Sequence, residues 1–460
     1  MTRPDVPMPR TLRFLLCVLM VSSAGCASYV SHSVKIRSSL AEGRFDSALE
    51  EVEKSESGSS HLLALYERGL ILHYAQQYGE SNLELHKAED LYDDLYTKSL
   101  SREAGALVTS DVITHFRGER FESAYIHYYK VLNYLHLGDG QGALVECRKL
   151  NQKLKTFRDA EDTFYTDDPF LEYLTGIVYE SQGDMSDAWV SYRIALEAYE
   201  NLGGSFNVRY PPDLACDVER AGERLGQMSD RPGPPESPEC PEIISGGGAV
   251  VLLLETGFAP HKTEVNIVAP ILEGELDADD FDADRFALTL ADRAGPRRVR
   301  AEKVVHWLKI AFPEIVEEPA WTDEVEVIPV EMPTSAVRAS RATSIETLVL
   351  RRFEERRTRI LAKTFARALT KYLAQRAAEK ETGRLGGIAV NLFNIATETA
   401  DTRSWSTLPG HIYLARLFLP EGRYTLQVVL RSGGERQDTI ALPDVEVTPG
   451  RTTFLNHRVF

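Results

Sequence analysis

The spacing of apolar residues changes once along this chain of 460 residues, and the change falls near residue 230. Between about residues 30 and 225, apolar residues recur every three or four positions and proline is rare, which predicts a series of helices. After residue 248 the pattern turns to short apolar or alternating runs, which predict strands. The stretch 226–248 is rich in proline and glycine and is expected to be a linker. The sequence therefore predicts an α+β protein, with a helical domain over 26–225 and a β-rich domain over 249–460.

The helical domain contains copies of one short turn pattern. In the clearest copy, Gly183 ends a helix, the small Ala188 lets the next helix pack closely, and Tyr192 and Ala195 continue the inward stripe. This pattern resembles the turn of a tetratricopeptide repeat. Weaker copies begin at Gly43, Gly118 and Gly138, and a degenerate one contains Tyr78, Leu85 and Ala88. Because the spacing of the copies is uneven, the sequence predicts an irregular TPR-like array, with a plain helical bundle as the alternative.

The second domain is expected to combine strands with one long helix. A capping box at 343–346 starts a helix predicted over 344–380, Gly383 is expected to end it, and a separate short helix is predicted over 387–399. Runs typical of strands lie at 249–254, 263–268, 309–313, 325–330, 411–418, 422–430 and 452–455, with a tight turn at 419–422. The last strands are expected to form a small β-sandwich-like region.

The first 25 residues have the layout of a secretory signal peptide. Arg3, Arg10 and Arg13 precede the apolar run 14–21, and small residues then lead to Cys26. The small residues before Cys26 resemble the lipobox of bacterial lipoproteins, although Ser23 stands where leucine is usual. The resemblance implies that 1–25 is a lipoprotein signal peptide, removed before Cys26, and that Cys26 carries acyl chains such as palmitate. A plain signal peptide with an incidental cysteine is the alternative.

Localisation follows from the same resemblance. The residues after the cysteine, Ala27 and Ser28, lack the aspartate that favours retention in the inner membrane. The chain is therefore expected in the periplasmic leaflet of the outer membrane.

Three cysteines remain for that oxidising compartment. Cys147 lies in a helical stretch and is expected to be a buried small apolar residue. Cys216 and Cys240 flank the proline-rich segment, and a disulfide between them would stabilise the fold by about 3 kcal/mol. Paired and unpaired states both remain open. The cysteines lack the spacing of a zinc site.

The charge of the chain is uneven. With a net charge of −17, the chain lacks the overall positive charge that is typical of a nucleic-acid-binding protein. The predicted long helix nevertheless has one basic face, which includes Arg352, Arg356, Arg359, Lys363 and Arg367. These side chains either form a solvated face paired with acidic neighbours or a docking surface for an acidic partner or glycan.

The segment 400–409 contains Asp401, Arg403 and Trp405, which either bind a ligand or lock a helix-to-strand corner. Together with 134–139 and 309–313, this segment resembles an uncharacterised family of bacterial tetratricopeptide-like envelope lipoproteins. That family carries no established reaction, and some relatives are associated with regulators of peptidoglycan synthases.

No catalytic motif and no metal-ligand spacing is present, so we expect neither enzyme activity nor a cofactor. The acidic run 277–284 lacks the glycine and glutamate of a helix–loop–helix calcium site, which predicts a solvated loop. The expected function is that of a lipid-anchored periplasmic scaffold or adaptor whose repeats offer a concave groove to other envelope proteins. The alternatives are a regulator of a peptidoglycan synthase or part of a surface-structure export complex, and, least favoured, an enzyme acting on peptidoglycan. The partner and the oligomeric state stay open.

Overall fold

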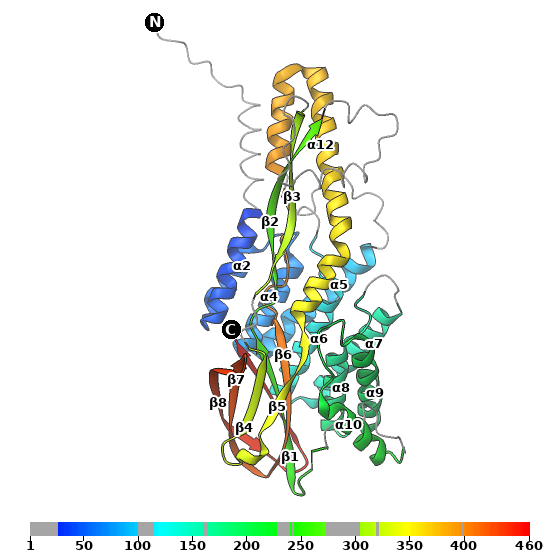
Figure 1. Ribbon diagram of the computed structural model, residues 1–460, viewed down its shortest axis with the longest axis vertical. Helices are drawn as coiled ribbons and strands as arrows, with labels where there is room; N and C mark the ends of the chain where they lie inside the picture. Colours follow the sequence, from blue (N-terminus) through cyan, green and yellow to red (C-terminus); the bar gives the residue numbers. More distant parts are fainter. Residues whose placement is uncertain are drawn as a thin grey trace.

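A computed structural model describes residues 26–99, 115–159, 164–227, 240–241, 243–272, 304–318, 322–397 and 399–460. The chain mixes helices and strands, as predicted (Figure 1). The signal segment 1–25 and the acidic run 277–284 lie outside the described residues, as does most of the proline-rich part of the expected linker.

The helical half consists of hairpins of neighbouring helices. α2 pairs with α3, α4 with α5, α6 with α7 and α8 with α9, and α10 packs on α9. Their bounds are α2 Cys26–Ala41, α3 Phe45–Ser55, α4 His61–Tyr74, α5 Tyr78–Ser99, α6 Arg120–His136, α7 Gly140–Arg158, α8 Pro169–Ser181, α9 Met185–Leu202 and α10 Pro212–Arg224. The turns expected after Gly43, Gly138 and Gly183 join the helices of a hairpin, and each of these glycines has a positive φ. The copy expected at Gly118 is not such a turn, because it starts the first helix of a pair.

Two of the hairpins share one packing feature. A glycine of the first helix faces a large residue sixteen positions later in the second helix. At Gly69 an added Cβ would lie 2.5 Å from the side chain of Leu85, and at Gly176 it would lie 2.4 Å from the ring of Tyr192. The residues at the same spacing in α6 and α7, Val131 and the small Cys147, are both buried. At Gly69 and Gly176, the absence of a side chain in one helix thus makes room for a large side chain of its partner, as close packing requires.

Seven strands form one sheet, in the order β8-β7-β4-β5-β6-β1-β9, and β2 pairs with β3 in a separate ribbon. All neighbours are antiparallel except β1 and β9. The bounds are β1 Gly247–Thr256, β2 His261–Leu272, β3 Val304–Val316, β4 Glu324–Pro329, β5 Val337–Ser344, β6 His411–Pro420, β7 Gly422–Ser432, β8 Glu435–Val447 and β9 Thr452–Val459; a short 3-10 turn, η3, spans Pro333–Ser335.

The sheet is nearly closed, so the expected β-sandwich is wrong. The edge strands β8 and β9 meet where Thr453 Oγ1 donates a hydrogen bond to the Glu446 carbonyl oxygen, at 2.6 Å. The tight turn expected after Leu419 is present, yet β6 and β7 do not pair with each other. The turn instead carries the chain around a corner to the far side of the curved sheet.

The central strands are buried on both faces. In β1, Val250 and Leu252 point into the core that the curved sheet encloses. Their neighbours Val251 and Leu253 point out of the curve and join the helices in the largest apolar core. This shared core contains residues from both sides of the expected linker. The glycines at the start of β1 allow neighbouring backbone segments to lie close to this strand. At Gly247, for example, an added Cβ would lie 2.4 Å from the Leu419 carbonyl oxygen.

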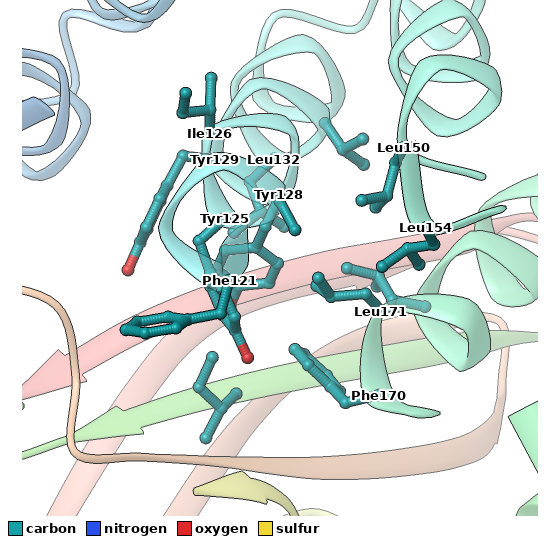
Figure 2. Packing of buried hydrophobic residues seen from close by; sticks show 14 of the residues in the cluster. Phe121, Tyr125, Ile126, Tyr128, Tyr129, Leu132, Leu150, Leu154, Phe170 and Leu171 are labelled. Carbon is teal, nitrogen blue, oxygen red and sulfur yellow. The ribbon is translucent and has the colours of Figure 1, made fainter. Parts of the chain in front are cut away.

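The helices that face the sheet are α4, α6 and α8, and they are almost wholly buried. Figure 2 shows side chains of α6, among them Tyr128 and Leu132, packed toward Leu150 and Leu154 of α7 and Phe170 of α8. In a repeat array these first helices line the groove. The open concave groove expected from the sequence is therefore not available in the described part of the chain, since the sheet covers it.

The long helix α12 spans Ile345–Thr397. The stop expected at Gly383 does not interrupt the element, and the residues expected to form a separate helix from 387 onward belong to the same α12. Figure 1 nevertheless shows α12 turning back on itself, so that two helical arms lie side by side. Beside α12 lies the ribbon of β2 and β3, which extends with it away from the sheet (Figure 1).

Candidate functional site

Two groups of residues that the sequence singled out separately line the same cavity, whose volume is about 520 Å³. The first group is the basic face of α12, with Arg352, Arg356, Arg359, Lys363 and Arg367. The second is the corner segment before β6, with Asp401, Arg403 and Trp405.

Four segments form the walls. α12 forms one, the corner segment a second, and the stretch from His115 into the start of α6 a third. The fourth comes from the base of the β2–β3 ribbon and includes Lys262 and Pro313. The site is thus assembled where the helical array, the ribbon and the long helix meet.

The cavity lining is strongly basic. Its cationic side chains are Arg117, Lys262, Arg352, Arg356, Arg359, Lys363, Arg367 and Arg403, against the carboxyl groups of Glu119, Glu122 and Asp401. In a chain with a net charge of −17, this is a local reversal of sign. Such a concentration of guanidinium and ammonium groups favours an anionic ligand.

Glu119 is held by two arginines of α12. Its Oε2 accepts a hydrogen bond from Arg352 Nε at 2.7 Å, and its Oε1 accepts one from Arg356 Nη1 at 2.7 Å. Burial alone would raise the pKa of Glu119, but the charges of Arg356 and Arg352 outweigh it and lower the pKa below its usual value. The carboxylate is therefore ionised and clamped at neutral pH.

The corner segment is locked by its own contacts. Arg403 donates two hydrogen bonds to the Asp401 carboxylate, each of 2.8 Å, and a third of 2.7 Å to the Ser59 carbonyl oxygen. Trp405 is only 2 % exposed and stacks on Tyr66 at 4.5 Å between ring centroids. These contacts hold the corner rigid, so it forms a fixed wall of the cavity.

Two buried carboxyl groups lie behind this wall. Burial, together with the charge of Glu119, raises the pKa of Glu122 to about 7, and its Oε1 accepts a hydrogen bond from the Trp405 backbone N–H at 3.2 Å. Burial raises the pKa of Glu67 to about 8, and its carboxyl accepts a hydrogen bond from Thr407. Near neutral pH the acidic charge behind the cavity is therefore reduced.

The helix that begins at Cys26 is fastened to the same corner. Tyr29 Oη donates a hydrogen bond to the Ser404 carbonyl oxygen at 2.9 Å, and the hydroxyls of Ser33 and Ser406 are 2.8 Å apart. The expected lipid-bearing residue therefore starts an element that contacts the cavity wall directly.

The other cysteines lie apart from the cavity. Cys216 in α10 and Cys240 are joined by a disulfide, with 5.5 Å between their Cα atoms. This bond fastens the end of the helical half to the segment that leads into β1. Cys147 is buried in α7, and burial raises the pKa of its thiol.

A second buried polar cluster contains Glu89, His127 and Glu146, whose side-chain ligand atoms lie within 4.8 Å of one another. The ammonium of Lys130 lies between the carboxylates, 2.7 Å from Glu89 Oε2 and 3.0 Å from Glu146 Oε1. Lys149 adds a second ammonium, 3.2 Å from Glu89 Oε1. These lysines supply the positive charge that a metal ion would bring, so the cluster is an ion-pair network inside the array.

Sequence reasoning missed Glu119, Lys262 and Phe116 as parts of the cavity. Phe116 and Glu119 lie in one segment, and Lys262 lies far along the chain in another. Only the packing of the ribbon and α12 against the start of α6 brings the two segments together. The one available signal was the Glu119-x-x-Glu122 pattern, which resembles a capping box at the start of a helix.

Among the described residues, no helix is long and apolar enough to cross a membrane. No protein-family model matches the chain, and no curated protein matches it. Among solved structures, a MamA protein is similar at 13 % identity over 44 % of this chain and 84 % of that chain, with a TM-score of 0.27. BtubC from P. vanneervenii is similar at 14 % identity over 48 % of this chain and 86 % of that chain, with a TM-score of 0.23. These TM-scores are too low to carry an argument about fold or function.

Proposed function

We propose that the protein is a non-catalytic adaptor of the bacterial cell envelope that binds another envelope protein at the basic cavity. In this proposal, acyl chains on Cys26 hold it at the periplasmic leaflet of the outer membrane. The observation that carries the proposal is the convergence of the basic face of α12 and the corner 401–405 on one cavity.

The covered groove directs binding to this cavity. The outer face of the sheet occupies the inner face of the helical array through Glu255, Arg416 and Arg458. Glu255 accepts hydrogen bonds from Tyr74 and Tyr128, and Arg416 donates to Asp217 and Glu180 at 2.7 and 2.8 Å. A partner would have to break these buried contacts to enter the groove, whereas the cavity already offers charged and apolar surface.

The position of α2 supports the link to the membrane. Its first residue would bear the lipid, and its next turns contact the corner that lines the cavity. An anchored molecule would therefore present the cavity at a fixed distance from the bilayer.

Site-specific photo-crosslinking in cells tests the binding site. A crosslinking amino acid replaces Arg356 at the cavity, whose side chain is 46 % exposed, or Val190 on α9, which is 48 % exposed and outside the cavity. We expect a crosslinked protein from position 356 and none from position 190. Equal adducts at both positions, or adducts only at 190, would contradict binding at the cavity.

Mass spectrometry of the mature N-terminus tests the anchor. We expect an N-terminal Cys26 that carries acyl chains. A chain that still contains Gly25, or an unmodified Cys26, would remove the lipid anchor from the proposal and leave the binding site to be judged separately.

A further inference from the structure

Resting on the proposed function, we infer that the cavity ligand is an acidic peptide segment of the partner, and that Glu119 occupies the position of its carboxylate in the unliganded protein. The partner segment would place one carboxylate on the arginines of α12 and a neighbouring apolar side chain against the apolar residues of the lining.

The first argument is that the cavity already binds a carboxylate. Arg352 and Arg356 both reach Glu119 at 2.7 Å, one through Nε and the other through Nη1. Guanidinium groups recognise carboxylates with this planar, directional geometry. The α12 face is therefore preorganised for the chemical group that an aspartate or glutamate side chain offers.

The second argument is the apolar part of the lining. Phe116, Phe121, Val349, Phe353, Ile360 and Trp405 all contribute to the cavity. A free inorganic anion gains nothing from such a surface, whereas a peptide with apolar side chains beside its acidic ones buries them there. The combination of basic and apolar walls favours a peptide.

The third argument concerns the mobility of the internal carboxylate. The backbone N–H of Glu119 donates to Glu122 Oε2 at 2.7 Å, so its main chain is fixed at the start of α6. Its side chain is 18 % exposed, and each of its oxygens accepts a hydrogen bond from an arginine of α12, while the carboxylate also caps the backbone of Glu122 at the start of α6. A ligand carboxylate can replace it on the arginines by a side-chain rotation that gives up this capping hydrogen bond without unwinding the helix.

Competition makes the inference testable. The full-length processed lipoprotein, purified in detergent micelles, is titrated against a fluorescein-labelled pentapeptide of alternating glutamate and phenylalanine, followed by fluorescence anisotropy. A pentapeptide of alternating lysine and phenylalanine is the charge control. We expect binding of the acidic peptide only.

Three variants locate the contact. Arg359→Gln, in the lining, should weaken binding by about tenfold, as loss of a charge-assisted hydrogen bond predicts. Arg357→Gln is the matched control, two residues away on the same helix, outside the lining and paired with Glu354. It should leave affinity unchanged. Glu119→Gln removes the competing charge and should tighten binding by about threefold or more.

Each other outcome counts against the inference. Equal binding of the basic peptide, equal loss from Arg357→Gln and Arg359→Gln, or no gain from Glu119→Gln would overturn it. Displacement of the acidic peptide by phosphatidylglycerol vesicles would assign the cavity to lipid headgroups instead. If peptides fail to bind while position 356 still crosslinks a partner protein, the ligand chemistry is wrong and the adaptor function stands.

Discussion

At the scale of single residues, the fold contains ionisable groups in places where water is absent. Glu67 is 3 % exposed, and burial raises its pKa to about 8. A carboxyl group whose pKa is raised on folding contributes stability below its unfolded pKa and loses that contribution as pH rises through the folded value. Glu67 therefore makes the protein less stable as pH increases from about 4.5 to about 8.

The variant Glu67→Gln should remove this dependence. At pH 9 we expect it to be more stable than the wild type by on the order of 2 kcal/mol, and at pH 5 to be nearly equal to it. Urea denaturation at both pH values measures the difference. Glu50→Gln, on the exposed face of α3, is the control and should change neither value. An unchanged pH slope in Glu67→Gln would show that this carboxyl is not buried in its acid form.

Lys130 is a buried cation that stabilises the fold through its ion pairs. Its side chain is 2 % exposed and neutralises Glu89 and Glu146 inside the array. Lys130→Met would leave two buried carboxylates short of a partner, so we expect a loss of on the order of 3 kcal/mol in the free energy of unfolding. Lys149→Met removes a 38 % exposed ammonium from the same carboxylates and should cost less than about 1 kcal/mol. Similar losses for the two variants in urea denaturation would contradict the asymmetry.

At the scale of elements, two helix pairs depend on a glycine that makes room for a large side chain of the partner helix. Gly176 in α8 lies against the Tyr192 ring of α9, where an added Cβ would be 2.4 Å away. Gly176→Ala should lower stability by about 2 kcal/mol, because overpacking outweighs the gain in helix propensity. Gly79→Ala is the matched control in α5, where nothing lies within 4 Å, and should be neutral or slightly stabilising. Thermal unfolding followed by circular dichroism separates the two, and equal behaviour would refute the close approach.

Sequence patterns predicted those elements whose apolar residues repeat with a clear period. β1 and β6 are apolar runs buried on both faces, and both were predicted from the sequence. β5 was missed because Val337–Ser344 is mostly polar, and β8 was missed because Glu435–Val447 is largely exposed at a sheet edge. The order of strands was not predictable, since the tight turn after Leu419 is typical of a hairpin but here rounds a corner of the sheet.

The candidate site, too, was only partly predictable from the sequence. The basic face of α12 is a local pattern with a helical period, and so it was visible in the sequence. Glu119 and Lys262 carry no such pattern, because their role depends on contacts between segments more than one hundred residues apart. Local periodicity thus predicted one wall of the cavity and left the other walls to the tertiary fold.

At the scale of the whole molecule, the two compositional halves share a core. Val251 and Leu414 of the sheet belong to the same apolar cluster as Tyr128 and Ile177 of the array. Across this interface Arg416, which is 4 % exposed, binds Asp217 and Glu180. A composition shift and a proline-rich stretch therefore mark a boundary in the sequence without separating two independent folding units.

A cut in the chain tests this sharing. A protease site introduced between residues 228 and 239 divides the halves, while the Cys216–Cys240 disulfide still joins them. After cleavage and reduction of the disulfide, we expect the fragments to elute together in size-exclusion chromatography, because the buried apolar core and the Arg416 ion pairs hold them. Arg416→Gln should lower the urea concentration at which the reduced, cleaved fragments separate. Separation of the wild-type fragments in buffer alone would show that the sheet does not close the groove of the array. That groove would then again be a candidate surface for binding a partner.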